Sequence, residues 1–468
     1  MVSQRALGVE MAGLDREERR RHAEGMVDTL HSAGVSGIIT TFVDNSGIIR
    51  AKTVPVQHLP SMAAWGVGFP PVFDRVRFDD AIAVSGTGAE PIGDARLVPD
   101  LQRLVVLAAQ PGWAWAPADR YQQDGTPHPQ DSRLVLRRLA DTLHADGLSM
   151  KCAFEIEWVL SNGASDSFAP EVHGAAYGMS RLIAASDYCR GLLSALHAQD
   201  IEVEQLHPEY SASQFELSVA ARSPSDAADD SVLVRTTIRA VGEKHGFRTS
   251  FSPKVDIAGV GNGGHCHFSL GRSSTNLMTG GDGAAGMTAE GESFVAGILG
   301  RLPALAAIGC PSIASYLRLV PSNWSGDYAC WGIENREAAI RLFPGAPDNS
   351  AWAANVEVKC FDLFANPYLL LAAIIAAGRD GIRVGSKLPP PITVDPVSLS
   401  PEALAAAGVS RLPISLRDSL SAFMSDDVLT SALGAELVAS LKAVRESEIA
   451  LFAEASPQEI AAANLWRF

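Results

Sequence analysis

The chain has 468 residues, of which 47% are hydrophobic and 19% are charged. At roughly 150 residues per domain, this length predicts two or three domains with a large core. Its 38 Lys and Arg side chains are outnumbered by 53 Asp and Glu, which gives a formal net charge of -15. We therefore expect neither a nucleic-acid-binding protein nor one that docks on anionic membranes, because both bind through positive charge.

The hydrophobic segments and the cysteines indicate where the protein works. The longest apolar runs, residues 302–317 and 363–378, are shorter than the ~20 residues that a membrane span needs, and both contain prolines. The charged N-terminus lacks the apolar core of a secretory signal. The six cysteines include no Cys-x-x-Cys pair and are typical of reduced thiols. These features predict a cytoplasmic enzyme that crosses no membrane.

The first predicted domain is small and rich in β-structure. Residues 14–33 predict a charged amphipathic helix that ends at Gly34. Two β-branched runs, 35–43 and 48–54, flank the turn sequence Asp-Asn-Ser-Gly and predict a hairpin. A stretch rich in Pro and Trp at 111–117 marks a boundary, so we place this domain at residues 14–117.

The second predicted domain, residues 127–468, mixes strands with helices. Asp131 is the expected N-cap of a helix that runs to about Ala145. The sequence Lys-Leu-Pro-Pro-Pro at 387–391 precedes a tail whose leucines recur at helical spacing. Together the two parts predict an α+β protein.

Acidic and imidazole side chains lie inside several strand-like runs. Glu155 and Glu157 are two residues apart in an apolar run and so share one face of a strand; a solvent-facing edge is the alternative. Glu216 lies in a similar run. The glycine-rich segment 261–264 leads into a strand that places His265, His267 and Ser269 on one face.

If these faces converge, their charges must be balanced. Two carboxylates ~4 Å apart repel by about 4 kcal/mol at an effective dielectric constant near 20. Hard oxygen ligands with a single His favour Mg²⁺ or Mn²⁺, and such ions usually serve phosphates. Arg318, Arg336 and Arg341 lie near Trp- and Gly-rich loops, and guanidinium groups suit phosphoryl oxygens, although surface ion pairs are the alternative for each. This combination indicates ATP-dependent activation of an acid.

Together, the motifs resemble the type I glutamine synthetase family along nearly the whole chain. The segments that carry the resemblance are Phe-x-Glu at 154–157, Glu-Val-Glu-Gln at 202–205, His-Pro-Glu at 207–209, Gln-Phe-Glu at 214–216, the glycine-rich His-x-His segment at 261–270, Arg-Leu-Val-Pro at 318–321, Asn-Arg at 335–336, Glu-Val-Lys at 357–359 and Ala-Asn-Pro-Tyr at 365–368. Because these motifs occur in the order that the family has, the resemblance does not depend on any one of them.

The resemblance implies an N-terminal β-grasp domain before a catalytic domain with a central antiparallel sheet and flanking helices. It implies two stacked hexameric rings and a reaction in which ATP phosphorylates the γ-carboxylate of glutamate before an amine attacks. The residues implied are Glu157, Glu209 and Glu216 for one Mg²⁺ or Mn²⁺; Glu155, His265 and Glu357 for the second; His267 and Ser269 for the nucleotide; Arg336 and Arg341 for the phosphates; and Arg318, Gly261 and Lys359 for the acid.

The departures from the family pattern concern the amine. Family members that use ammonia carry a Glu six residues after the Arg of Arg-Leu-Val-Pro, and Trp324 stands there. Their Phe-Asp-Gly-Ser-Ser segment is also missing: Phe69 is followed by prolines, and Asp74 is at best a displaced substitute. A large apolar side chain suits a carbon-bearing amine, so we expect a ligase that forms a γ-glutamyl amide from glutamate and an organic amine.

Three alternatives stay open. The chain is an ordinary ammonia-using glutamine synthetase if Asp74 or Asp327 replaces the lost acids. It uses another acid if Val260, Asn355 and Lys359, which replace Asn, Arg and Arg of the family, alter the acid site. It is a non-catalytic scaffold if it binds neither metal nor ATP.

Overall fold

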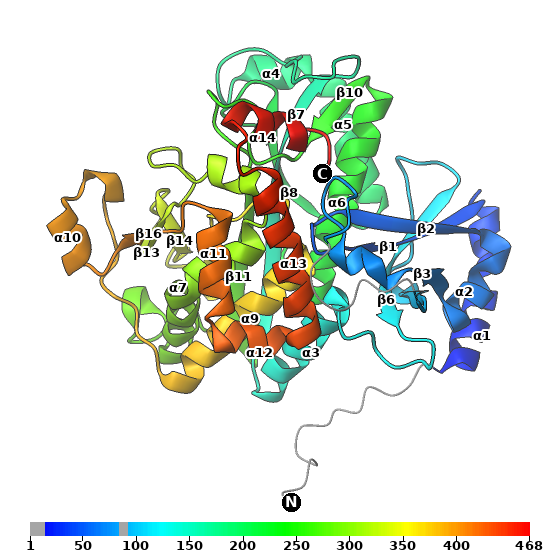
Figure 1. Cartoon of the computed structure of the whole chain (residues 1–468), viewed down its shortest axis with the longest axis horizontal. Helices are drawn as coiled ribbons and strands as arrows, with labels where there is room; N and C mark the ends of the chain where they lie inside the picture. Colours follow the sequence, from blue (N-terminus) through cyan, green and yellow to red (C-terminus); the bar gives the residue numbers. More distant parts are fainter. Residues whose placement is uncertain (1–14, 84–91) are drawn as a thin grey trace, which may run out of the picture.

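The computed structural model describes residues 15–83 and 92–468. The start of the first predicted helix, residue 14, lies outside these ranges. Two sheets form the frame of the molecule, one in the N-terminal part and one in the remainder (Figure 1). The Cα register and the caps show why the chain forms these elements where it does.

The N-terminal sheet has the strand order β2-β1-β6-β4-β3, with β5 beside β6. The predicted hairpin is confirmed: β1 and β2 pair antiparallel, and β1 pairs with β6 in parallel. Asp15 caps the first helix through the backbone N–H of Glu18. The elements are α1 (Arg16–Ser32), β1 (Gly37–Val43), β2 (Ile49–Pro55), α2 (Leu59–Trp65), β3 (Val67–Phe69), β4 (Ala95–Pro99), β5 (Val105–Val106) and β6 (Trp113–Tyr121).

The second sheet follows the order β16-β13-β14-β15-β11-β7-β9-β8, with β10 beside β7 and β12 beside β11. It is antiparallel, as expected, except that β13 and β14 pair in parallel. Its strands are β7 (Ser149–Asn162), β8 (Val203–Pro208), β9 (Gln214–Val219), β10 (Phe247–Ser250), β11 (Gly264–Arg272), β12 (Thr275–Asn276), β13 (Tyr328–Ile333), β14 (Ala338–Phe343), β15 (Asn355–Val358) and β16 (Ser410–Arg411).

Helices pack on the apolar face of this sheet. In β7 the buried side chains Phe154, Ile156 and Trp158 alternate with the acidic ones and join the main core, so the two faces of the strand have opposite character. The helices are α3 (Ser132–Ala145), α4 (Met179–Ala184), α5 (Ser186–Ala198), α6 (Pro224–Lys244), α7 (Ala289–Gly309), α8 (Ser350–Ala353), α9 (Pro367–Val384), α10 (Pro401–Ala406), α11 (Leu416–Met424), α12 (Asp427–Leu433), α13 (Ala435–Leu451) and α14 (Pro457–Asn464).

Two expectations about helices are settled here. Asp131 caps α3 by accepting a hydrogen bond from Leu134, as predicted. In the apolar run 302–317, Pro303 does not interrupt the helix, because α7 continues through it, whereas the helix ends at Gly309, before Pro311. Among the described helices, α7 alone is long and apolar enough to span a membrane, but 78% of its apolar window is buried inside the protein. Its composition therefore serves core packing against α9.

Candidate active site

The strand register places the acidic and imidazole side chains directly opposite one another. Glu155 faces His265 across the β7–β11 pair, and Glu157 faces Glu216 across the β7–β9 pair. His207 faces Glu216 from β8 on the other side. Directly opposed side chains in an antiparallel pair lie within about 5.5 Å at Cβ, so the sheet itself brings together residues that are more than a hundred positions apart.

A third row continues the pattern toward the other edge of the sheet. Glu357 of β15 lies between His267 of β11 and Arg341 of β14. All these side chains line one cleft of about 700 Å³. The alternative in which Glu155 and Glu157 face open solvent is therefore wrong: Glu157 is buried and Glu155 is half-buried in the cleft wall.

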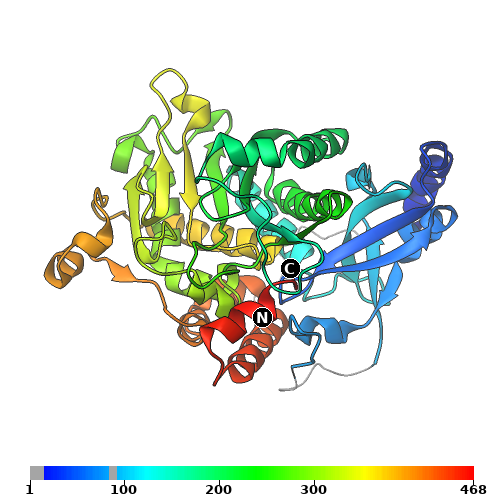
Figure 2. The same ribbon diagram turned by 90° about the horizontal axis from the view of Figure 1, so that it is seen from above.

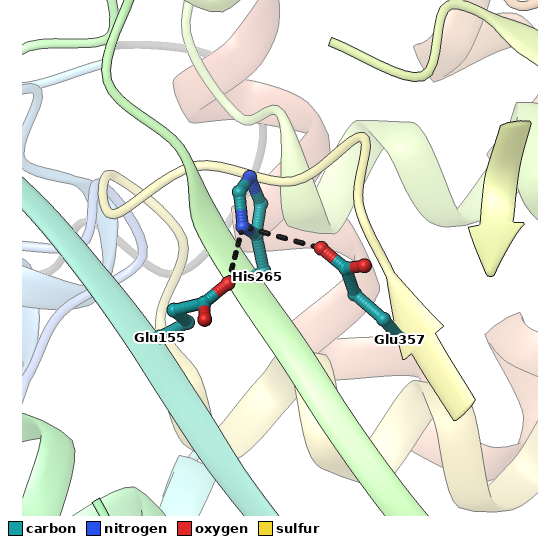
Figure 3. Close-up of side chains that lie close together, drawn as sticks. All are labelled: Glu155, His265 and Glu357. Carbon is teal, nitrogen blue, oxygen red and sulfur yellow. Dashed lines mark hydrogen bonds and ion pairs between the residues drawn. The ribbon is translucent and has the colours of Figure 1, made fainter. Parts of the chain in front are cut away.

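The first cluster of possible metal ligands is Glu155, His265 and Glu357 (Figure 3). Nδ1 of His265 lies 2.9 Å from a carboxylate oxygen of Glu155 and 3.3 Å from one of Glu357. The three side chains come from three adjacent strands and point at one another (Figure 3). Two carboxylates and one imidazole form the oxygen-rich donor set that suits Mg²⁺ or Mn²⁺.

Two further clusters share Glu216. One joins it to Glu157 and His265, and the other joins it to His207 and Glu209. Nε2 of His207 lies 3.2 Å from Glu216, so His207 belongs to the site although the sequence analysis did not select it. The signal was present, because His207 lies two residues before Glu209 in the same motif.

A hydrogen-bond network fixes Glu157. Its Oε2 accepts hydrogen bonds from the backbone N–H of Gly263 at 2.8 Å and from Nε2 of Gln214 at 3.0 Å. Gln214 was quoted only as part of a motif, and the structure shows that it positions this carboxylate. A side chain at Gly263 would bring a Cβ within 2.3 Å of His265 and 2.8 Å of Arg318, which explains why glycine stands there.

Burial and mutual repulsion divide the carboxylates. Burial and the charges of Glu155, Glu157 and Glu209 raise the pKa of Glu216 well above its usual value. Burial also raises the pKa of Glu155, but its hydrogen bond with His265 and the neighbouring His267 outweigh that effect and lower this pKa well below the usual value. A divalent cation among these oxygens would relieve the repulsion, and the donors present fit one.

Cationic side chains lie beside the acidic clusters in the cleft wall. Arg318, Arg336, Arg341 and Lys359 all line it. Arg318 is buried and donates to the carbonyl oxygens of Cys360 and Lys359 at 3.1 and 3.3 Å. Nη1 of Arg341 lies 3.4 Å from Glu357, and Nζ of Lys359 lies 3.7 Å from it. The cleft therefore offers positive groups for an anionic substrate next to the clusters that suit cations.

Aromatic side chains form one wall of the same cleft. Trp324 and Tyr210 meet edge to face with ring centroids 5.0 Å apart, and Trp324 is 43% exposed. Tyr210 directly follows Glu209, and the hydroxyl of Tyr177 donates to the Glu209 carboxylate. Trp324 therefore lies in the cleft, as expected. Tyr210 and Tyr177 also line it, and neither was predicted.

The remaining candidate residues lie as follows. Gly261, His267 and Val260 line the cleft, whereas Ser269 lines a neighbouring hollow with Lys151 and Trp352. Asp74 and Asp327 are buried and paired with Arg120 and Arg411, and within the described parts of the chain neither lines the cleft. Their proposed role as substitutes for a lost ammonium ligand is therefore not supported by this chain's own cleft.

These features define a class of protein. Rows of carboxylates and imidazoles that suit divalent cations, with guanidinium groups close by, form the site of an enzyme that transfers a phosphoryl group to an acid. The glycines next to His265 let the backbone approach the site closely.

Comparison with known proteins identifies the family. The model of the family "Glutamine synthetase, catalytic domain" matches residues 129–462. A γ-glutamylpolyamine synthetase of Streptomyces coelicolor is 51% identical, covering 95% of this chain and 96% of that protein. A glutamate–methylamine ligase of Methyloversatilis universalis is 30% identical, covering 86% and 89%. The crystal structure of a novel glutamine synthase homolog superposes with a TM-score of 0.84 at 31% identity, covering 93% of this chain and 99% of that one.

The chain belongs to the glutamine synthetase family. It is a carbon–nitrogen ligase, and the predicted resemblance, α+β fold and enzyme class are confirmed. Use of ATP and a divalent metal is general in this family, and the clusters of the cleft agree with it.

Proposed function

We propose that this chain forms a γ-glutamyl amide from glutamate and one primary amine of a polyamine, with ATP as the phosphoryl donor. One observation carries the proposal: the cleft has the cation clusters and guanidinium groups of the family, yet Trp324 and Tyr210 form an aromatic wall where the family pattern has an acid for ammonium. The similarity to a γ-glutamylpolyamine synthetase over nearly the full length supports this choice of amine.

The reaction has two steps. An oxygen of the glutamate γ-carboxylate attacks the γ-phosphorus of ATP, and ADP leaves, which gives γ-glutamyl phosphate. The nitrogen of a neutral primary amine then attacks the acyl carbon; the C–O bond to phosphate breaks, inorganic phosphate leaves and the amine nitrogen loses one proton. Both steps move negative charge between oxygens that the cationic wall of the cleft can contact.

The roles of the site residues form part of the proposal. Arg336 and Arg341 bind the transferred phosphoryl group and stabilise its charge, while Arg318, Gly261 and Lys359 hold the acid. His267 and Ser269 contact the nucleotide, whose base would extend toward the hollow beside Trp352. Divalent cations bound in the clusters would polarise phosphoryl oxygens; Glu157, Glu209 and Glu216 would hold one, and Glu155, His265 and Glu357 would hold the second.

A polyamine exploits the aromatic wall better than ammonia does. Its methylene chain lies along the rings of Trp324 and Tyr210, and a distal ammonium group meets a ring face, a contact worth about 0.5–2 kcal/mol. Ammonia has neither a chain nor a second charge. The kcat/KM should therefore rise from ammonia through a monoamine to a diamine.

The test is an amine panel. Phosphate release is measured with ATP, Mg²⁺, glutamate and, in turn, ammonia, methylamine, butylamine, putrescine and spermidine. We expect kcat/KM to be highest with the diamine or longer polyamine and about two- to thirtyfold lower with butylamine, which has the same carbon chain as putrescine but one charge. Turnover with ammonia equal to that with every amine would reject the proposal. Replacing glutamate with aspartate or a keto acid tests the identity of the acid.

The domain boundaries, the assembly and the location complete the proposal. We place the domains at residues 14–117 and 127–468; strand β6 of the N-terminal sheet continues past the first boundary, to Tyr121. We propose a dodecamer of two stacked hexamers, in which the N-terminal domain of one subunit completes the cleft of its neighbour, and a cytoplasmic location. Analytical ultracentrifugation of the purified protein tests the assembly.

A further inference from the structure

A second cavity lies between the two parts of the chain, and it shares no lining residue with the catalytic cleft. Its volume is about 460 Å³, which is within the range of small-molecule sites. Residues of the hairpin β1–β2 and strand β6 line one side, and residues of helix α6 line the other; the ribbons of these elements lie side by side in Figures 1 and 2. Most of the lining is apolar, with Ile39, Leu107, Trp115 and Phe251 among its side chains.

Two arginines one helical turn apart on α6 line this cavity. Arg235 is 4% exposed, and one of its nitrogens donates to the carbonyl oxygen of Leu363 at 2.6 Å. Within residues 15–83 and 92–468, its Nε and Nη2 have no hydrogen-bond partner, nor does Nη2 of Arg239. Buried donors on charged groups are costly when they stay unpaired, so this pair of guanidinium groups calls for an acceptor that the described protein atoms do not supply.

The electrostatics point the same way. Burial and the charge of Arg239 lower the pKa of Arg235 to about 10. Burial lowers that of Arg239 to about 10 as well, although Glu243 opposes the shift. Because both cations are destabilised by their surroundings, a negative charge beside them would be stabilising.

We propose that this interdomain cavity binds an organic monocarboxylate with an apolar body. The carboxylate pairs with the guanidinium groups of Arg235 and Arg239, and the body packs against Trp115 and Phe251. Glu243 and Arg467 also line the cavity, with opposite charges, and its mostly apolar lining disfavours a doubly charged group, which favours a carboxylate over a phosphate. Since the lining comes from both parts of the chain, such a ligand would hold the N-terminal sheet against α6.

The proposal is tested by calorimetry and thermal shift on the full chain, using phenylpropionate as the probe. Glutamate and ADP are present at saturation so that the catalytic cleft is occupied. We expect binding of phenylpropionate, a higher melting temperature, and no effect of phenylpropanol, which has the same body without the charge. Arg239→Met should weaken binding at least about tenfold, and Arg190→Met, an exposed arginine of α5, should leave it unchanged.

A variant that improves binding separates the proposed role from structural damage. Glu243→Gln removes the opposing charge and should tighten binding about two- to threefold, whereas a merely disturbed cavity would not gain affinity. Arg235→Met is a further variant, but Arg235 is buried and this variant can fail to fold. Arg239 is only partly buried, so Arg239→Met tests the proposal without it. The proposal is overturned if phenylpropionate does not bind, if Arg239→Met binds it as tightly as the native protein, or if phenyl phosphate binds in preference.

Discussion

The aromatic wall of the catalytic cleft provides the sharpest test of amine selection. Replacing Trp324 with Ala removes one ring of the Trp324–Tyr210 pair but leaves the backbone N–H that donates to Glu337 at 3.2 Å. The loop is therefore still anchored at this position. The backbone of Trp324 is in the left-handed region, with φ +52°, and Ala has no β-branch that would make this conformation harder to adopt.

The magnitude follows from the exposure of the ring. Because Trp324 is 43% exposed, its cation–π contact with an alkylammonium group is worth about 1 kcal/mol. Covering roughly one methylene group adds about 0.8 kcal/mol. At 1.4 kcal/mol per factor of ten, the sum predicts a fall in kcat/KM for putrescine of about 20-fold, of which the cation–π contact alone gives about fivefold.

The assay compares two nucleophiles, putrescine and hydroxylamine, with glutamate and ATP in excess. Trp324→Phe, which keeps an aromatic face, should stay within about threefold of the native enzyme with putrescine. Hydroxylamine, which has no carbon chain, should be used equally well by the native enzyme and by Trp324→Ala. If Trp324→Ala loses as much activity with hydroxylamine as with putrescine, the residue acts on acid activation and the reasoning about the amine is refuted.

Three further outcomes are expected. Glu216→Gln should weaken Mn²⁺ binding yet make the metal-free protein about 1–3 kcal/mol more stable to urea, because it removes one of several carboxylates that repel one another; equal or lower stability would contradict this. Mg²⁺ binding should be weaker at pH 6 than at pH 8 and should release more protons at pH 6. The reason is that the pKa values of Glu209 and Glu216 are raised, so a cation must displace their protons at the lower pH. Calorimetry in two buffers measures this proton release. Arg120→Met should cost about 3–5 kcal/mol of unfolding free energy, because it leaves Asp74 and its neighbour Asp131 buried without their partner, whereas Arg190→Met should cost less than about 1 kcal/mol.

Much of the fold could be predicted because the relevant signals are local. The hairpin at β1–β2 and the cap of α3 at Asp131 depend on a few adjacent residues, and both were found where expected. The alternation in β7 gave the shared face of Glu155 and Glu157. What alternation cannot give is which strand lies beside which, and the opposition of Glu155 to His265 depends on that pairing.

Other features escaped prediction because tertiary packing decides them. Trp331 follows Trp324 by seven residues in the sequence, but it is 1% exposed and its indole N–H donates to the carbonyl oxygen of Pro389. Tyr210 was not considered, yet it completes the aromatic wall, because its partner Trp324 is more than a hundred residues away in the sequence. An aromatic residue has the same sequence signal in a core and in a pocket.

The division of labour between sheet and loops explains how the amine can change within one family. Several of the groups that suit cations and phosphate, such as Glu157, His265 and Arg341, lie on strands whose positions are fixed by backbone register. The aromatic wall instead comes from chain outside the strands, since Tyr210 follows β8 and Trp324 precedes β13. Loops tolerate substitution because few core contacts depend on them. A change of residue at these two places can therefore alter which nucleophile reaches the acyl phosphate while the rows of the sheet that activate the acid stay as they are.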